Sequence, residues 1–347
     1  MTDRPATARS PDEPRRPLRV LVTGGAGFIG SHLVERLVGQ GHAVTVVDDL
    51  STGRASNLDT AVGSGGRVEL IESDLAGALP ALGDAPPFDR AYHLAAAVGV
   101  DLVLNDPVRA IEINVESTSA LLRHLAAHGA PPTLIASSSE VYGKPGTAVF
   151  SEDDDSLYGS TTITRWSYAH AKALDEHLAL GYHATRGLPV VVARFFNTIG
   201  PRQRGTYGMV VPRFVEAALA GEPLRVFGDG RQSRCFCDVR DVVLALPALL
   251  DDPACHGRVY NIGSDRSITI LALAERVIGT LGSASGVRMV PYSEAYPGGF
   301  EDLRQRCPEL SRVREAVGFE PTIPLARTIE DIAAAMRAEQ TRAGVAR

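Results

Sequence analysis

Short apolar runs alternate with stretches of helical periodicity along the first part of the chain. Residues 18–23 form a continuous apolar run that leads into a glycine-rich loop. Residues 28–38 then repeat apolar positions with helical spacing, and residues 43–47 are again apolar and β-branched. This order predicts a strand, a loop, a helix and a second strand.

The same alternation continues through the N-terminal half. Helical stretches are expected around 107–128 and 166–186. Apolar runs typical of buried strands occupy residues 68–71, 90–94, 133–136 and 190–194. Strands that alternate with helices predict an α/β fold of the Rossmann type, a doubly wound parallel sheet that binds its ligand at the carboxyl ends of the strands.

After Asn197 the pattern changes to loops rich in Gly, Pro and Arg, such as 200–208 and 227–234. These loops predict a smaller C-terminal α/β lobe that closes over a substrate. A helix is expected over 238–250 and a strand over 259–262. The predicted division is a disordered tail (1–17), a first lobe (18–197, with 236–262 returning to it) and a second lobe (198–235 and 263–340).

Composition narrows the class of protein. The 347 residues are 44% hydrophobic and 22% charged, enough for a large core in two lobes. The formal charge is -6 and the chain has no long Lys/Arg run, so its charge pattern does not indicate binding to nucleic acid or to an anionic membrane. The first 17 residues are polar and proline-rich, unlike a signal peptide, and no apolar run is long enough to span a bilayer.

The four cysteines favour a reduced, cytoplasmic setting. They are Cys235, Cys237, Cys255 and Cys307, and the Cys-Phe-Cys spacing is too tight for an easy mutual disulfide within a strand. One such pair with a distant cysteine and scattered histidines is weak evidence for zinc, so no metal is expected.

The glycine loop predicts a dinucleotide site. Gly24, Gly27 and Gly30 allow the tight turn, the approach of pyrophosphate and helix packing, and the helix that starts at Phe28 and Ile29 offers its N-terminus to the phosphates. Asp48 ends the next strand, where a carboxylate accepts both ribose hydroxyls and repels a 2′-phosphate, so NAD is favoured over NADP.

Two further residues complete the predicted cofactor site. Leu94 lies at the end of the fourth strand, and Asp74 follows the third strand, where it can face the adenine. A solvated loop carboxylate is an equally good interpretation of Asp74.

Tyr168 and Lys172 stand four residues apart in Tyr-Ala-His-Ala-Lys, so they share a helix face. The ammonium can lower the pKa of the phenol and let phenolate act as a base near neutral pH. With the dinucleotide loop, this pair predicts hydride chemistry on a hydroxyl. Seen alone, it is also a common helix-surface pair.

A family resemblance rests on several segments together. The segments TGGAGFIGSH, HLAAA, SSSEVYG, YAHAK and RFFNTIGPR, with Asp48, resemble extended short-chain dehydrogenases/reductases that act on nucleotide sugars. The resemblance implies a catalytic triad of Ser138, Tyr168 and Lys172. In it Ser138 bonds the sugar O4, Tyr168 is the base, and Lys172 tunes Tyr168 and holds the nicotinamide ribose.

Within that family the chain looks like the UDP-glucuronate decarboxylases. Dehydratases carry Asp-Glu where this chain has Ser139-Glu140, and simple 4-epimerases usually lack the carboxylate. Arg306 matches an arginine of the decarboxylases, although Cys307 replaces their usual lysine. The resemblance therefore implies that Glu140 and Arg306 are catalytic, with UDP-xylose or the UDP-4-keto-pentose as product.

The resemblance also implies the nucleotide contacts and the assembly. Phe227 would lie against the uracil, Arg234 toward the diphosphate and Asn197 near the sugar diphosphate, and Ser139 would be a further substrate-binding residue. A homodimer would pair through the helices around 107–128 and 166–186. Arg165 could reach the substrate carboxylate or be a helix-start charge, and it is left out of the predicted site.

Other interpretations stay open at this point. Arg306 could be a surface arginine, Glu140 a structural carboxylate and Phe227 part of the core. A UDP-glucuronate 4-epimerase is the alternative enzyme. A non-catalytic NAD-binding regulator on the same fold is the alternative of another class.

Overall fold

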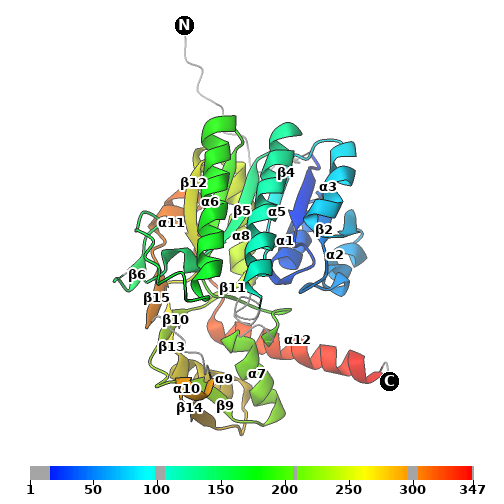
Figure 1. The fold of residues 1–347 in the computed structure, drawn as a ribbon. Helices are drawn as coiled ribbons and strands as arrows, with labels where there is room; N and C mark the ends of the chain where they lie inside the picture. The colour runs from blue at the N-terminus through cyan, green and yellow to red at the C-terminus, as the bar shows by residue number, and fades with distance from the viewer. Residues whose placement is uncertain (1–15, 98–105, 145, 206–208, 296–303, 346–347) are drawn as a thin grey trace.

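A seven-stranded parallel sheet forms the larger lobe (Figure 1). The computed structural model describes residues 16–97, 106–144, 146–205, 209–295 and 304–345. The sheet order is β3-β2-β1-β4-β5-β7-β12. Its strands are β1 (Arg19–Thr23), β2 (Ala43–Asp48), β3 (Val68–Glu72), β4 (Arg90–His93), β5 (Thr133–Ser138), β7 (Val190–Phe195) and β12 (Arg258–Ile262). The predicted doubly wound sheet is confirmed, and its order reverses between β1 and β4, which is where such sheets bind ligands.

Helices cover both faces of this sheet. One face packs on α1 (Phe28–Gly39), α8 (Val239–Asp251) and α11 (Ser311–Val317), and the other on α3 (Leu75–Asp84), α5 (Pro107–Ala127) and α6 (Trp166–Arg186). Side chains alternate along each strand, so Val20 and Val22 of β1 face the first layer while Leu21 faces the second. In Figure 1, α5 and α6 stand in front of the sheet.

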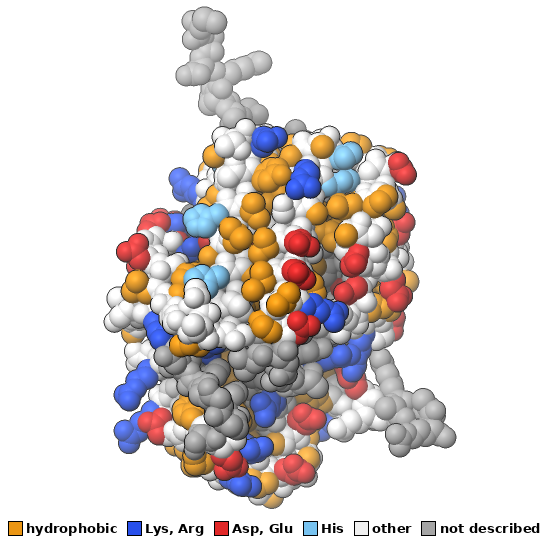
Figure 2. Space-filling view, viewed as in Figure 1, with side chains coloured by type: hydrophobic (Ala, Val, Ile, Leu, Met, Phe, Trp, Pro, Cys, Tyr) orange, Lys and Arg blue, Asp and Glu red, His pale blue; other side chains and the backbone are white. Residues whose placement is uncertain are grey.

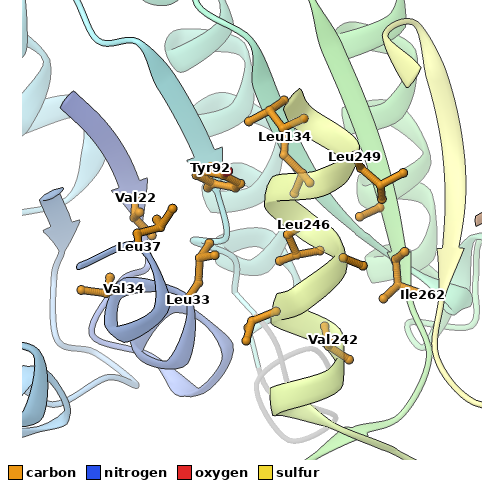
Figure 3. Close-up of a cluster of buried hydrophobic side chains, with 14 of the residues drawn as sticks. Val22, Leu33, Val34, Leu37, Tyr92, Leu134, Val242, Leu246, Leu249 and Ile262 are labelled. Carbon is orange, nitrogen blue, oxygen red and sulfur yellow. The ribbon is translucent and has the colours of Figure 1, made fainter. Parts of the chain in front are cut away.

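Helix α8 links the C-terminal half of the chain to the larger lobe. Its residues Val242, Leu246 and Leu249 belong to the buried cluster that also contains Leu33 and Leu37 of α1 (Figure 3). The helix expected over 238–250 and the strand expected over 259–262 are thus both present, and β12 pairs with β7. Leu310, Val313 and Phe319 around α11 join the same cluster.

The second lobe lies beyond the carboxyl ends of the strands, at the bottom of Figure 1. Its core packs α7 (Val210–Ala220), α9 (Ile270–Leu281) and α12 (Leu325–Val345) on the parallel pair β9 (Leu224–Phe227) and β14 (Val287–Val290). A four-stranded sheet joins the lobes in the order β13 (Ser267–Thr269), β10 (Ser233–Cys235), β15 (Gln305–Pro308) and β6 (Val149–Phe150).

Shorter elements complete the described fold. They are α2 (Asp59–Gly63), α10 (Tyr292–Ala295), the pair β8 (Thr198–Ile199) and β11 (Cys237–Asp238), and the 3-10 turns η1 (Ala55–Leu58), η2 (Ser139–Tyr142) and η4 (Pro253–Cys255). Most of the predicted tail, residues 1–15, lies outside the described residues. Within the described parts of the chain, no helix combines the length and apolar character needed to cross a membrane.

A buried ion pair fastens α6 to the sheet. The Arg194 guanidinium on β7 donates to both carboxylate oxygens of Glu176 on α6, at 2.9 and 2.7 Å. The Ser137 hydroxyl of β5 donates to the same carboxylate. This bidentate pair fixes the helix against the strand that ends at Ser138, because a guanidinium and a carboxylate match in only a few geometries.

A second buried pair lies one turn earlier on α6. The Lys172 ammonium donates to Asp175 at 2.9 Å, and the two side chains are 2% and 0% exposed. Burial raises the pKa of Asp175 overall, while the Lys172 ammonium and the nearby Thr118 hydroxyl of α5 oppose that rise. Thr118 in turn lies 3.1 Å from His93 Nε2, and His93 Nδ1 lies 2.7 Å from the Thr23 hydroxyl. A chain of buried polar groups therefore runs from the end of β1 to Lys172.

We predict that Asp175→Asn destabilises the protein by about 3 kcal/mol, because the Lys172 ammonium is then buried without its counter-charge. In a Lys172→Met background the same change should cost far less. Urea unfolding of the two single variants and the double variant measures this coupling. Glu320→Gln, which breaks an exposed pair with Arg314, is the control, with an expected cost below about 1 kcal/mol. Additive costs of Asp175→Asn and Lys172→Met would contradict the pairing.

Candidate active site

The loop between β1 and α1 is shaped by glycines. Gly24 has a φ of +71°, and a Cβ there would lie 2.6 Å from the Ala95 nitrogen. A Cβ on Gly30 would lie 2.1 Å from the Gly24 carbonyl oxygen. A side chain at either position would therefore force the backbone apart, so this turn requires glycine.

The N-terminus of α1, the helix after this loop, is suited to bind an anion. Gly27 precedes α1 as its N-cap and supplies no capping side chain, and no acidic residue occupies the first turn. The first backbone N–H groups, around Phe28 and Ile29, are the kind of donors that a phosphate accepts. The loop and helix start thus fit the pyrophosphate of a dinucleotide.

Asp48 is oriented at the end of β2 by two backbone donors. Ala26 N–H donates to one carboxylate oxygen and Leu50 N–H to the other, each at 2.9 Å. Burial raises the pKa of Asp48 above its usual value. Each oxygen keeps a further lone pair, so the fixed carboxylate can accept ribose hydroxyls.

Asp74 and Leu94 are placed differently from each other. The exposed Asp74 carboxylate accepts the Gly77 N–H at 2.7 Å and caps α3. Leu94 is half-buried after β4, and its N–H donates to the Thr23 carbonyl at 3.0 Å. Leu94 therefore lies beside the glycine loop, whereas the Asp74 side chain already has a structural role as a cap.

Ser138 and Tyr168 meet between β5 and α6. The Ser138 oxygen accepts the Glu140 N–H at 3.2 Å, and the Ser138 hydroxyl lies close enough to Tyr168 to influence the pKa of its phenol. Burial raises the pKa of Tyr168 above its ordinary value, the Glu140 carboxylate raises it further, and Ser138 opposes this rise. The two hydroxyls thus lie together as one unit.

The Tyr168 pKa differs from the expectation that Lys172 lowers it. The Lys172 ammonium contacts Asp175, one turn further along α6, and the negative charge of Asp175 also raises the Tyr168 pKa. Burial and two carboxylates therefore determine the protonation of Tyr168 in this arrangement.

Glu140 and Arg306 form an ion pair beside this unit. Arg306 Nη1 donates to the Glu140 carboxylate at 2.7 Å and to the Ser139 hydroxyl at 3.3 Å. Glu140 lies in the turn η2, directly after β5. Arg306 lies on β15, a strand of the sheet that joins the lobes. The contact therefore connects residues 166 positions apart in sequence.

Two further arginines surround Glu140. Arg165 Nη2 lies 3.7 Å from the Glu140 carboxylate, and Arg234 is the direct neighbour of Arg306 in the paired strands β10 and β15. Burial raises the pKa of Glu140, but the charges of Arg306, Arg165 and Arg234 outweigh burial and hold that pKa below its usual range. Glu140 is consequently ionised at neutral pH.

Arg165 is the residue that the sequence interpretation left out. One feature of the sequence indicates that Arg165 lies near the site, which is its position three residues before Tyr168. The surplus of positive charge around Glu140 suits a substrate that brings its own anions, such as a carboxylate and a diphosphate. Arg306 Nε is also buried without a hydrogen-bond partner among the described residues, which leaves a donor for such a ligand.

The predicted nucleotide residues lie on the second lobe and at its border. Phe227 ends β9, half-buried, with the Arg213 and Arg225 guanidinium groups 5.6 and 5.9 Å from its ring centroid. Asn197 donates from its side chain to the Cys235 carbonyl at 3.1 Å, which ties the end of β7 to β10. Arg234 Nη1 donates to the Ser233 carbonyl at 2.7 Å.

Across the ranges that the structure describes, no group of three or more His, Cys, Asp or Glu side chains is arranged to hold a metal ion.

Three comparisons place this geometry among known proteins. A UDP-N-acetyl-alpha-D-glucosaminuronate decarboxylase of Bacillus cytotoxicus is 42% identical over 88% of this chain and 93% of its own length. UDP-glucuronic acid decarboxylase 1 of Arabidopsis thaliana is 36% identical over 90% of this chain and 68% of its own length. The crystal structure of a Bacillus cereus UDP-glucuronic acid 4-epimerase with UDP-glucuronic acid and NAD is 27% identical, with a TM-score of 0.81 over 93% of this chain and all of that chain.

The family model for the NAD dependent epimerase/dehydratase family matches residues 20–263, which include the glycine loop, Ser138, Tyr168 and Lys172. The chain therefore belongs to this family, the extended short-chain dehydrogenases/reductases, and its cofactor is NAD.

Proposed function

We propose that the protein decarboxylates UDP-glucuronate through oxidation at C4, and gives UDP-xylose or the UDP-4-keto-pentose. The observation that carries this proposal is the Glu140–Arg306 ion pair next to the neighbouring hydroxyls of Ser138 and Tyr168. The decarboxylases among its relatives, at 36 to 42% identity, support the same reaction.

Oxidation at C4 begins with removal of the hydroxyl proton. Tyr168 accepts that proton, and Ser138 holds the substrate oxygen and the phenol oxygen together. NAD, when bound, takes the hydride from C4 and can return it later. Gly24, Gly27, Gly30 and Asp48 would hold its pyrophosphate and ribose, and Lys172 would reach the nicotinamide ribose on leaving Asp175.

Loss of carbon dioxide then follows from the chemistry of the ketone. A C4 ketone lies β to the C6 carboxylate, so cleavage of the C5–C6 bond leaves its electron pair as an enolate with negative charge on O4. Ser138 and the now protonated Tyr168 donate to that oxyanion. The high pKa of Tyr168 suits this second step, because the phenol keeps its proton while it donates.

Glu140 and Arg306 would act at the carboxylate end of the sugar. Arg306 can hold the C6 carboxylate or the departing carbon dioxide, and Glu140 can position a water that delivers a proton to C5. Arg165, within 3.7 Å of Glu140, is added to this group. On the nucleotide side we assign Phe227 to the uracil, Arg234 to the diphosphate, and Asn197 and Ser139 to the sugar diphosphate.

These assignments divide the substrates between the lobes. NAD would bind the lobe formed by 18–197 and 236–262, and the UDP-sugar would bind the lobe formed by 198–235 and 263–340, although α11 within the latter range packs on the larger sheet. The ion pair between Glu140 and Arg306 spans this division.

A second substrate deserves the same test. The relative that is 42% identical is named for UDP-N-acetylglucosaminuronate, which differs from UDP-glucuronate at C2 and shares the reacting C4, C5 and C6 atoms. The proposed chemistry applies to either sugar. A 4-epimerase would give a product that keeps the C6 carboxylate. A non-catalytic regulator would convert neither sugar.

Proton NMR of the protein with NAD and each UDP-uronate, with measurement of carbon dioxide, tests the proposal. We expect a pentose product and one carbon dioxide per turnover from at least one of the two sugars.

Tyr168→Phe should lose C4 oxidation, and Arg306→Ala should lower turnover by about a hundredfold, the effect of losing a strong bond to a charged group. Arg312→Ala, which removes a guanidinium paired with Asp153 near the surface, is the matched control and should keep its activity. A C4 epimer that retains the carboxylate would sink the decarboxylase proposal.

Glu140→Gln should shift the pH dependence of kcat/KM. The Glu140 charge raises the pKa of Tyr168, so its removal lowers that pKa and moves the acidic limb of the profile to lower pH, even though turnover falls. Glu309→Gln, which changes a carboxylate that accepts the Ser311 N–H and hydroxyl, should leave the limb in place. An unchanged or higher limb in Glu140→Gln would contradict the assignment of Tyr168 as the base.

The assembly that we propose is a homodimer through α5 and α6. These helices pack on each other, and Val108, Ile111 and Leu174 on them are 63%, 41% and 47% exposed. Figure 2 shows hydrophobic side chains along the face of the molecule that these helices form. Burial of such side chains against a second copy would remove them from water.

Sedimentation should therefore give a mass of about twice 36.8 kDa for the parent protein. Leu174→Glu should shift the protein toward the mass of one chain, because a charge would be buried in the interface. Leu244→Glu on α8 is the matched control, since Leu244 is also 47% exposed but lies on the opposite side of the sheet. A parent protein with the mass of a single chain would overturn the dimer.

A further inference from the structure

Two cysteines lie side by side where the lobes join. Strands β10 and β15 pair in parallel, with Ser233 opposite Gln305 and Arg234 opposite Arg306. The next step of this register sets Cys235 beside Cys307. This adjacency agrees with the pKa of Cys235, which the neighbouring Cys307 thiol helps to raise.

The two thiols differ in exposure. Cys235 is 0% exposed between β13 and β15, whereas Cys307 is partly open to solvent. Burial raises the pKa of Cys235 above its usual value, and the neighbouring Cys307 raises it further. One member of the pair can therefore meet a dissolved reagent and the other cannot.

We propose that Cys235 and Cys307 form a reversible disulfide that links β10 to β15 and lowers the activity of the enzyme. Only the effect on activity rests on the proposed function. The disulfide itself follows from the pairing of the strands, which sets the two cysteines next to each other.

The spacing of the strands permits this bond. Neighbouring strands lie about 4.8 Å apart, and disulfides join residues whose Cα atoms are about 4.4 to 6.8 Å apart. Paired residues of parallel strands also project from the same face of the sheet. Because side chains that project in parallel keep roughly the strand spacing, and the Cβ atoms of a disulfide lie about 3.5 to 4.5 Å apart, the bond needs rotation of the two side chains and a small approach of the strands.

The reaction balances with a small disulfide such as oxidised glutathione as the oxidant. The Cys307 thiolate attacks one glutathione sulfur, forms a mixed disulfide and releases one glutathione thiolate. Cys235 then loses its proton, attacks the Cys307 sulfur and releases the second glutathione. The protein loses two electrons and two protons, which the oxidant and the solvent receive.

The second step should be the slow one. Its nucleophile, the Cys235 thiolate, is scarce because its pKa is raised. Once Cys307 is bound to glutathione it can no longer carry a negative charge, so one of the causes of that raised pKa disappears. The ring-closing rate should still increase as the pH rises above neutrality, because the thiolate fraction increases.

The effect on activity follows from the neighbours of the two cysteines. Arg234 and Arg306 immediately precede them on the same strands and project from the opposite face. Arg306 reaches Glu140 at 2.7 Å and Ser139 at 3.3 Å. A covalent link on one face of the strand pair shifts the backbone that carries both guanidinium groups, and hydrogen bonds to charged groups are sensitive to such shifts.

The test oxidises the whole protein with glutathione disulfide at pH 7 and pH 8.5, about neutral and basic conditions for thiol exchange. Intact mass and peptide mapping then identify the bonded cysteines. We expect the loss of two hydrogen masses, a cross-linked peptide pair containing Cys235 and Cys307, and faster closure at the higher pH. Dithiothreitol should reverse the change.

Variants separate the pair from the other cysteines. Cys307→Ser should give neither the cross-link nor the mixed disulfide, Cys235→Ser should stop at the mixed disulfide on Cys307, and Cys255→Ser should still close.

A protein that takes up glutathione on Cys307 without closing, or that does not react, would overturn the proposed disulfide. Closure without the expected loss of activity, about tenfold for one weakened bond to a charged group, would overturn the switch alone. If no uronate is turned over even by the reduced protein, the proposed function fails while the mass result still decides the disulfide.

Discussion

The buried pair of Glu176 and Arg194 is the constraint on which the arrangement of the site depends. It holds α6 against β7, and the Ser137 hydroxyl of β5 contacts the same carboxylate. Ser138 is the next residue along β5, so one ion pair sets the distance between the strand end and the helix that carries Tyr168. Such pairs contribute little net stability after desolvation, but loss of one partner is costly, which makes them effective at fixing one register.

Charge is distributed unevenly across this framework. On one side of Tyr168 stands Glu140 with several arginines, and on the other stands Lys172 with Asp175. The carboxylates raise the pKa of the phenol, and the cations compensate the carboxylates rather than the phenol. A proton on Tyr168 is thus the resting state, and the base has to be created by a change in the partner of Lys172 or by the substrate's own charge.

The sequence predicts best those features that local geometry decides. Gly24 and Gly30 permit one backbone path, and Asp48 follows from the end of its strand, so these positions could be identified from spacing alone. The partner of Lys172 could not, because Tyr168 and Asp175 both lie about one helical turn away and only the packing of α5 chooses between them. Arg306 was identified by resemblance, since nothing local connects it to Glu140, 166 residues earlier. Arg165 was considered and left out of the predicted site because a charge at the start of a helix has an ordinary explanation.

The small sheet of β13, β10, β15 and β6 explains why these distant residues meet. Its strands come from four separate stretches of the chain, and β6 follows the segment that begins at Glu140. Because β6 pairs with β15, the strand of Arg306 is aligned with the strand after Glu140 by backbone hydrogen bonds. The ion pair is then a consequence of register, and any change in that register moves Arg306 and Arg234 together. The sheet that crosses between the lobes therefore ties the positions of Arg306 and Arg234 to each other and to the strand after Glu140 through backbone hydrogen bonds, which no single side chain could do.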